Sequence, residues 1–161
     1  MFTQSEAEYF MNMSKKKVSN NNYDFPLARE SLVIPIISTD DKVNFLLDIN
    51  RKGEISLTKC TKCTYQERYQ EVNILVRLDL DGPTHENPFI QPVPLTYLEP
   101  YNGSVIPTPH LHLYVEGFMD KWAIPANNRF PRTSDLFLTL EDFFQFCNII
   151  EPPAIQRGLF V

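Results

Sequence analysis

Residues 70–80 read QEVNILVRLDL, and this stretch decides the fold that we expect. Every second side chain in it is apolar, at Val72, Ile74, Val76, Leu78 and Leu80. Successive side chains of a strand point to opposite faces, so the alternation predicts a strand with one face on a core. The other face offers Arg77 and Asp79.

Three further segments upstream also predict strands. Residues 31–38 (SLVIPIIS) read as a strand whose proline favours a sheet edge or a bulge. Residues 43–51 (VNFLLDINR) and 54–62 (EISLTKCTK) flank Lys52-Gly53, and this arrangement predicts a hairpin because glycine supplies the positive φ of a tight turn. Together they predict a largely antiparallel sheet.

Residues 109–117 read PHLHLYVEG and predict another strand with two unlike faces. Three aliphatic side chains point one way, whereas His110, His112, Tyr114 and Glu116 point the other way. Such a polar face suits proton transfer, metal binding or phosphate chemistry.

Helices are expected near both ends of the chain. Thr3 and Glu6 form a capping box for a helix over residues 4–16, and three lysines at 15–17 would lie at its C-terminal end, where the dipole favours cations. A second helix is expected over about 140–149, capped near Thr139. The chain therefore reads as a single α+β domain over residues 1–161. It would have an antiparallel sheet of four to six strands over about 31–118, both helices packed on one face, and a proline-rich loop at 83–107 partly roofing the other.

Composition narrows the function classes. The net charge of −5 over 161 residues argues against a protein that coats DNA through bulk charge. Apolar runs are far shorter than the ~20 residues needed to cross a bilayer, so no membrane association is expected. An acidic N-terminus and an odd number of cysteines indicate a cytoplasmic protein in a reducing compartment. The lone Cys60/Cys63 pair lacks the second ligand pair of a structural zinc site.

Metal-independent RNA cleavage is the first chemistry that suits the polar strand face. It needs a base, an acid and cations that stabilise the phosphorane. The candidate catalytic residues are His110, His112, Glu116, His85 and Tyr114. The candidate substrate-binding residues are Arg77, Lys59, Arg68, Gln66, Tyr65, Arg51 and Lys121.

Two other interpretations of the histidines stay open. His85, His110 and His112 could bind zinc, since a His-x-His pair on a strand with a third histidine is a zinc-binding arrangement. They could equally be structural, bonded to loop carbonyls or lining a solvated face. We expect no obligatory cofactor.

A series of motifs resembles a family of small bacterial and phage-borne proteins of unknown function. The motifs are Asp48-Ile-Asn-Arg51, Lys59, Tyr65-Gln66 with Arg68, Leu75–Asp79, His85 with Asn87-Pro88, Pro109–Gly117 and Lys121-Trp-Ala123. The resemblance runs from the first expected helix to the tail at 157–160 and implies a single cytoplasmic domain without an assigned activity. The Cys60/Cys63 pair is a departure from the family pattern.

Two functions from different classes follow. The first is a small RNA-cleaving or RNA-processing enzyme with histidine acid–base catalysis, toxin-like or from a mobile element, whose partner is RNA. The alternative is a non-enzymatic interaction protein, such as an antitoxin, a phage anti-defence inhibitor or a defence accessory factor, whose partner is a protein. The histidine face favours the enzyme, and the acidic charge favours the interaction protein.

Overall fold

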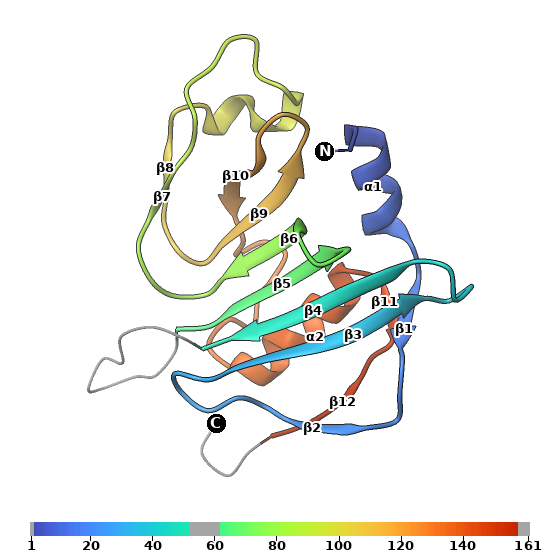
Figure 1. The fold of residues 1–161 in the computed structure, drawn as a ribbon. Coiled ribbons are helices and arrows are strands. Elements are labelled where there is room, and N and C mark those ends of the chain that lie inside the picture. Colours follow the sequence, from blue (N-terminus) through green and yellow to red (C-terminus); the bar gives the residue numbers. More distant parts are fainter. Residues whose placement is uncertain (1, 52–61, 158–161) are drawn as a thin grey trace.

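The computed structural model of the chain describes residues 2–51 and 62–157, and one eight-stranded sheet dominates them (Figure 1). All neighbouring strands in it are antiparallel except β1 and β11, which are parallel. From edge to edge the strands are β10 (Met119–Pro125), β9 (His110–Val115), β6 (Asn73–Asp79), β5 (Thr64–Tyr69), β4 (Asn44–Asn50), β3 (Ser31–Ser38), β1 (Lys15–Lys17) and β11 (Ile149–Glu151).

Smaller elements complete the described part of the chain. Two additional strand pairs are β2 (Asn22–Asp24) with β12 (Ala154–Gln156), and β7 (His85–Glu86) with β8 (Val105–Ile106). The helices are α1 (Gln4–Asn12), α2 (Leu136–Phe146) and the short 3₁₀ helix η1 (Thr96–Tyr101). No helix of the described residues is long and apolar enough to cross a membrane.

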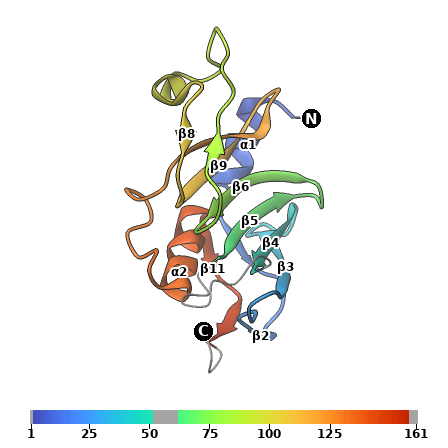
Figure 2. The same ribbon diagram turned by 90° about the vertical axis from the view of Figure 1, so that its left-hand side faces the viewer.

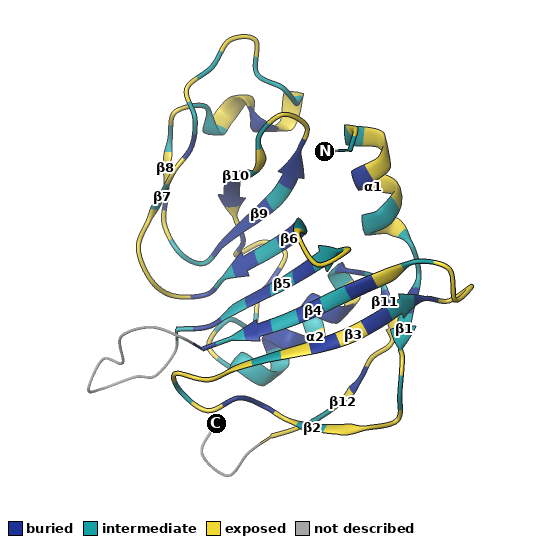
Figure 3. Ribbon diagram, in the orientation of Figure 1, coloured by how far each residue is buried: buried dark blue, intermediate teal, exposed yellow. Residues whose placement is uncertain are grey.

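Helix α2 covers one face of the central strands (Figures 1 and 2). Asp135 caps it by accepting hydrogen bonds from two backbone N–H groups of its first turn. The ring of Phe143 on α2 lies 5.8 Å from that of Tyr65 on β5, whose hydroxyl donates to the Leu136 carbonyl. Buried and less buried residues alternate along β4 and β5 (Figure 3), so the face away from α2 is the more polar one.

Helix α1 packs at the end of the sheet beside β6 and β9 (Figure 1). Its aromatic side chains make the contact. The Phe10 ring stacks on Tyr69 with centroids 4.1 Å apart, and Phe2, just before the helix, stacks on Tyr114 at 4.3 Å.

The expected fold class was wrong. An antiparallel sheet of four to six strands with both terminal helices on one face was predicted, whereas the sheet has eight strands and is mixed. Strands expected at 31–38, 43–51, 70–80 and 109–117 are confirmed within a few residues. The difference comes from four strands that carry no apolar alternation and were not predicted: β1, β5, β10 and β11.

A buried ion pair explains why β1 and β5 escaped prediction. The first helix ends at Asn12 instead of residue 16, and Lys15 lies in a strand, fully buried. Its Nζ lies 3.1 Å from Oε1 of Glu67, which is also fully buried on β5. The ammonium also donates to the carbonyls of Met11, Met13 and Cys147 at 2.9–3.0 Å. Each charge is compatible with the interior only because the other is there.

Other helix and strand boundaries also differ from the predicted ones. The second helix begins at Leu136, about one turn before the predicted start at 140, because Asp135 provides the cap and not Thr139. The second arm of the predicted hairpin, at 54–62, lies almost wholly outside the described residues. In the structure β4 pairs antiparallel with β3 on one side and with β5 on the other, where Asp48 lies opposite Gln66.

The buried pair gives a stability prediction. Lys15→Met leaves the Glu67 carboxylate buried without its counter-charge, so we expect it to lower the free energy of unfolding by about 3–5 kcal/mol. Lys16→Met is the matched control on the same strand. It removes a pair with Asp41, whose carboxylate is 67% exposed, and should cost less than about 1 kcal/mol. Urea unfolding measures both, and equal losses would contradict the role of Lys15.

Candidate active site

Three adjacent strands, β5, β6 and β9, build the candidate active site. Asp79 on β6 lies opposite Thr64 on β5 and opposite His110 on β9. Two residues earlier, Arg77 lies opposite His112 in the same ladder. Side chains two residues apart share a face, so these five groups gather on the face away from α2.

The proline-rich loop at 83–107 brings a third histidine, His85, to this face. The loop is tied to the edge strand β10 by Asn87. Its amide nitrogen donates to the Ala123 carbonyl at 2.8 Å, and its amide oxygen accepts from the Ala123 N–H at 2.8 Å. This two-way bond imitates the pairing of a strand and fixes β7, where His85 lies, beside β9 and β10.

The three imidazoles form one cluster. The ring centroid of His85 lies 4.5 Å from that of His112 and 5.9 Å from that of His110. The two histidines of β9 are 4.9 Å apart. Both of these are buried, whereas His85 is half-buried, so His85 is the imidazole that meets solvent.

Asp79 is the anionic centre of the cluster. Its Oδ2 lies 3.3 Å from Nε2 of His110, 3.3 Å from Nε2 of His112 and 3.1 Å from Nε of Arg77. Its Oδ1 accepts from the Thr64 hydroxyl at 2.7 Å. Burial opposes ionisation, but the hydrogen bond from His110, the Arg77 charge and the Thr64 hydroxyl outweigh it and hold the pKa of Asp79 well below its ordinary value.

His112 is held as a neutral ring. Its Nδ1 lies 2.8 Å from the Asp120 carbonyl oxygen, which can only accept, so Nδ1 carries the proton. Its Nε2 is then free to accept from Nη2 of Arg77, at 2.9 Å. Burial is the main cause that lowers the pKa of His112, and the Arg77 charge adds to it. Arg77 also pairs with the Asp120 carboxylate, so its guanidinium is fixed from three sides.

His110 and His85 have a different arrangement of protons. Nε2 of His110 points to the ionised Asp79 carboxylate, so that nitrogen carries the proton. Its Nδ1 is then an unprotonated, buried nitrogen, and it has no hydrogen-bond partner among the described residues. Nε2 of His85 donates to the Lys121 carbonyl at 2.9 Å, which leaves Nδ1 of His85 for other contacts.

These groups line a pocket of about 290 Å³. Its cations are Arg77 and Lys62. The other lining residues are Thr64, Asp79, Asp81, Pro83, Thr84, His85, Thr108, His110 and His112.

The same groups include a set that could ligate a metal. One ligand atom each from Asp79, His110 and His112 lies within 4.8 Å of the others. Two histidines and a carboxylate are a known set for divalent metals. The Arg77 guanidinium, however, already bonds the Asp79 carboxylate and Nε2 of His112, so an ion would have to displace it. The donor set thus fits a metal only after Arg77 has moved.

Two of the predicted catalytic residues lie at the other end of β9. The Tyr114 hydroxyl donates to the Phe2 carbonyl at 2.7 Å, and the ring is buried. Glu116 lies beyond the strand and accepts from the Gln4 N–H at 2.9 Å, at the start of α1. Both residues attach the N-terminal segment to the sheet, about 13–20 Å along the strand from His110 at the usual rise per residue.

Two of the predicted substrate-binding residues are buried away from the pocket. Tyr65 lies on the α2 face of β5, because its neighbours Thr64 and Gln66 occupy the opposite face. Arg51 is 5% exposed and donates to the Pro26 carbonyl at 3.1 Å.

Of the other predicted substrate-binding residues, those that the structure describes lie at or near the site. Arg77 is inside the pocket. Gln66 and Arg68 lie on the same sheet face, one strand further on. Lys121 is exposed on β10, and its carbonyl accepts from His85. Lys59 lies outside the described residues.

The sequence did not predict the residues that hold the histidine cluster together. Asp120 binds both His112 and Arg77, and Asn87 positions the loop that carries His85. The sequence does indicate where Asp120 lies. Gly117, whose φ is 80°, marks the hairpin turn between β9 and β10, and Asp120 follows that turn on the strand that pairs with β9. Nothing in the sequence pattern pointed to the tertiary contact of Asn87.

A model of one protein family matches residues 2–149, and it is described as a family of unknown function (DUF6978). The chain belongs to this family. Membership in DUF6978 agrees with the resemblance to a family without an assigned activity, and it brings no catalytic residue with it. Neither the search of curated proteins nor that of solved structures gave a match. The site of this DUF6978 member therefore has to be interpreted from its own geometry.

The low pKa of Asp79 gives a prediction for acid stability. A depressed carboxyl pKa contributes stability that is present above the unfolded-state pKa and is lost as the pH falls towards the folded-state value. Asp79→Asn should therefore cost about 2–3 kcal/mol near pH 6. The difference from wild type should stay nearly constant down to about pH 4 and shrink below it, because the carboxyl then takes up a proton in the unfolded state but not in the folded state.

Urea unfolding at a series of pH values measures this difference. Asp24→Asn changes an exposed carboxylate on β2 that does not line the pocket, and it should alter stability near pH 6 by less than about 0.5 kcal/mol. A cost of Asp79→Asn that stays constant down to pH 3 would contradict the assigned ionisation.

Proposed function

We propose that the chain is a metal-independent enzyme that cleaves RNA by acid–base catalysis at His85 and His110. One observation carries the proposal. A solvent-facing imidazole, His85, lies 5.9 Å from a second imidazole, His110, whose Nδ1 has no partner among the described residues. A base and an acid on either side of one phosphate are what the reaction requires.

Two cationic side chains of the pocket, Arg77 and Lys62, favour a phosphate ester as substrate, even though Asp79 and Asp120 already pair with Arg77. Arg77 supplies a guanidinium that can donate to phosphoryl oxygens, and Lys62 adds a second cation at the rim. Bonds to Asp79, Asp120 and His112 orient the guanidinium before substrate arrives. Such preorganised donors stabilise the charge that develops on a phosphorane.

RNA is favoured because its 2′-hydroxyl is an internal nucleophile. Nδ1 of His110 is buried, so the substrate must uncover it; it then takes the 2′-hydroxyl proton while the 2′-oxygen forms a bond to phosphorus. The bond from phosphorus to the 5′-oxygen breaks, and protonated His85 gives that oxygen a proton from Nδ1. The products are a 2′,3′-cyclic phosphate and a free 5′-hydroxyl, so atoms and charge balance without a metal or an activated water.

The hydrogen bonds of the two imidazoles suit these roles. The Asp79 carboxylate fixes the tautomer of His110 and stabilises the imidazolium that forms there. The Lys121 carbonyl keeps Nε2 of His85 protonated in both charge states, so that Nδ1 is the nitrogen that exchanges protons. His112 acts through Arg77, whose guanidinium it positions.

The biological setting that we propose is the cytoplasm of a bacterial cell, where RNA is the abundant phosphodiester. The resemblance to phage-borne proteins supports a toxin-like role or a role in conflicts between phage and host. A protein partner that restrains such an activity would be consistent with the acidic charge of the chain.

Cleavage of a labelled mixed-sequence RNA tests the proposal. We expect purified protein to cleave the RNA in the presence of EDTA and to leave the matching DNA intact. His85→Ala should lower the rate by about 10²–10⁴-fold, because one proton-transfer group is lost. Glu86→Gln, a change of the exposed neighbour on β7, is the control and should keep the rate of wild type.

Three outcomes would contradict the proposal. Unchanged cleavage by His85→Ala would remove His85 from the reaction. Cleavage that is lost with EDTA would favour a metal at Asp79, His110 and His112. Absence of any RNA cleavage, together with a stoichiometric protein that co-purifies with the chain, would favour the interaction protein.

A further inference from the structure

Two electron-rich atoms face each other within the histidine cluster. Oδ2 of Asp79 lies 3.3 Å from Nε2 of His112, and neither atom carries a proton, because the carboxyl is ionised and the His112 proton is on Nδ1. Two acceptors at this distance repel each other unless a cation binds both. The Arg77 guanidinium is that cation, with Nε 3.1 Å from the carboxylate oxygen and Nη2 2.9 Å from the imidazole nitrogen.

The same atoms have the geometry of a metal site. Nε2 of His110 also lies 3.3 Å from Oδ2 of Asp79, and one ligand atom each from Asp79, His110 and His112 lies within 4.8 Å of the others. Ligand atoms about 2.0–2.1 Å from a tetrahedral zinc ion are about 3.3–3.4 Å apart, so both distances from carboxylate to imidazole match a zinc site. Imidazole ligands favour zinc and similar transition metals over Mg²⁺.

Groups behind these ligands fix the atoms that would bind the metal. The Asp120 carbonyl accepts from Nδ1 of His112 at 2.8 Å, which leaves Nε2 unprotonated. The Thr64 hydroxyl donates to the other carboxylate oxygen of Asp79 at 2.7 Å. Hydrogen bonds of this kind orient the ligands of metal sites and raise the affinity for the metal.

Arg77 can leave the three ligands and keep an anionic partner. Its guanidinium also pairs with the carboxylate of Asp120, which lies on β10 and is not one of the ligands. An incoming Zn²⁺ would neutralise Asp79 in place of the guanidinium. The exchange therefore leaves no buried charge without a counter-charge.

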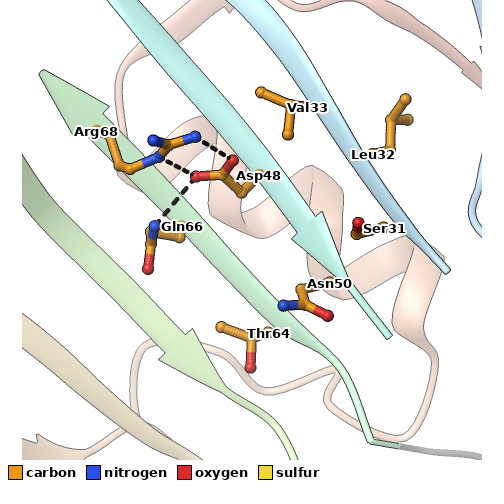
Figure 4. Close-up of a pocket in the computed structure, with 8 residues that line it drawn as sticks. All are labelled: Ser31, Leu32, Val33, Asp48, Asn50, Thr64, Gln66 and Arg68. Atoms are coloured by element: carbon orange, nitrogen blue, oxygen red, sulfur yellow. Dashed lines mark hydrogen bonds and ion pairs between the residues drawn. The ribbon is translucent and has the colours of Figure 1, made fainter. Parts of the chain in front are cut away.

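A second aspartate–arginine pair on the same sheet face provides a comparison. Asp48 on β4 and Arg68 on β5 are joined by two hydrogen bonds, Nε to Oδ2 at 2.6 Å and Nη2 to Oδ1 at 2.7 Å (Figure 4). Gln66 donates to the same carboxylate at 3.1 Å, and no histidine is among the described residues that line this hollow. Arg68 thus binds a carboxylate alone, whereas Arg77 binds a carboxylate and an imidazole.

We propose that Asp79 and the two histidines of β9 bind Zn²⁺ in place of the Arg77 guanidinium, and that the ion inhibits the enzyme. The inhibition rests on the proposed function, whereas the binding of the metal does not. To bind the ion, His110 must give up the proton of Nε2 and carry one on Nδ1, the nitrogen assigned as the base. Zinc would therefore block the base and also remove the guanidinium from the phosphate.

Competition with a coloured zinc chelator measures binding by the full chain without any cleavage. We expect one Zn²⁺ per chain at this site. Arg77→Leu removes the competing guanidinium and should tighten binding by at least about tenfold. His112→Gln removes a ligand and should weaken binding by at least about tenfold. Arg68→Leu, which frees Asp48 in the comparison pair, is the matched control and should stay within about twofold of wild type.

Two further measurements complete the test. Co²⁺ bound in place of Zn²⁺ should show no charge transfer from sulfur, because the ligands are nitrogen and oxygen. One equivalent of Zn²⁺ should abolish RNA cleavage by the wild-type chain, and excess EDTA should restore it.

The results separate this inference from the proposed reaction. No binding of zinc, equal affinity in wild type and Arg77→Leu, or charge transfer from sulfur to cobalt would overturn the site. Unchanged or faster cleavage by the zinc-bound chain would overturn the inhibition. Tighter zinc binding by Arg77→Leu, in a chain that cleaves no RNA with or without zinc, would keep the metal site and remove the proposed reaction.

Discussion

The structure depends on the buried pair of Lys15 and Glu67. Neither charge is exposed, and the ammonium also bonds carbonyls at the end of α1 and after α2. Three parts of the chain that are distant in the sequence, namely the α1–β1 segment, β5 and the end of α2, therefore meet at one nitrogen atom. Burial raises the pKa of the Glu67 carboxyl, and the Lys15 charge opposes that rise. An arrangement of this kind contributes more to the choice of one register than to the net free energy of folding, because desolvation offsets much of the attraction.

The same pair marks the limit of what the sequence could predict about the fold. Strands with apolar alternation were found, since burial of every second side chain leaves its record in the sequence. Lys15 and Glu67 bury charged groups where the other strands bury apolar side chains. In a sequence, lysine and glutamate are typical of the solvent-exposed ends of helices and strands. The burial of each charge can be explained only by the presence of the other, and 51 residues lie between them in the sequence. Strand β11 was even harder to predict from the sequence, because it has only three residues and pairs in parallel with β1.

The candidate site, too, could be predicted only in part from the sequence. The two-residue period placed His110 and His112 on one face together, and the order of the strands brought Arg77 and Asp79 beside them. The same period also assigned Tyr114 and Glu116 to this site. The strand, however, continues beyond the pocket, and both residues contact the N-terminal segment instead. The roles within the cluster follow from contacts that no spacing reveals. Asp120 orders Arg77 and His112, and the tie at Asn87 decides that His85 is the imidazole facing solvent.

The Asn87 tie has a consequence for association of the folded chain. Strand β10 is an edge of the large sheet, and edge strands expose backbone groups to which another chain can add. Asn87 occupies both the N–H and the C=O of Ala123 near the middle of that edge. One amide therefore holds His85 in the imidazole cluster and occupies backbone groups to which another chain could add. In this protein, a sequence change that frees the loop would take His85 out of the cluster and expose an edge prone to aggregation, both at the same residue.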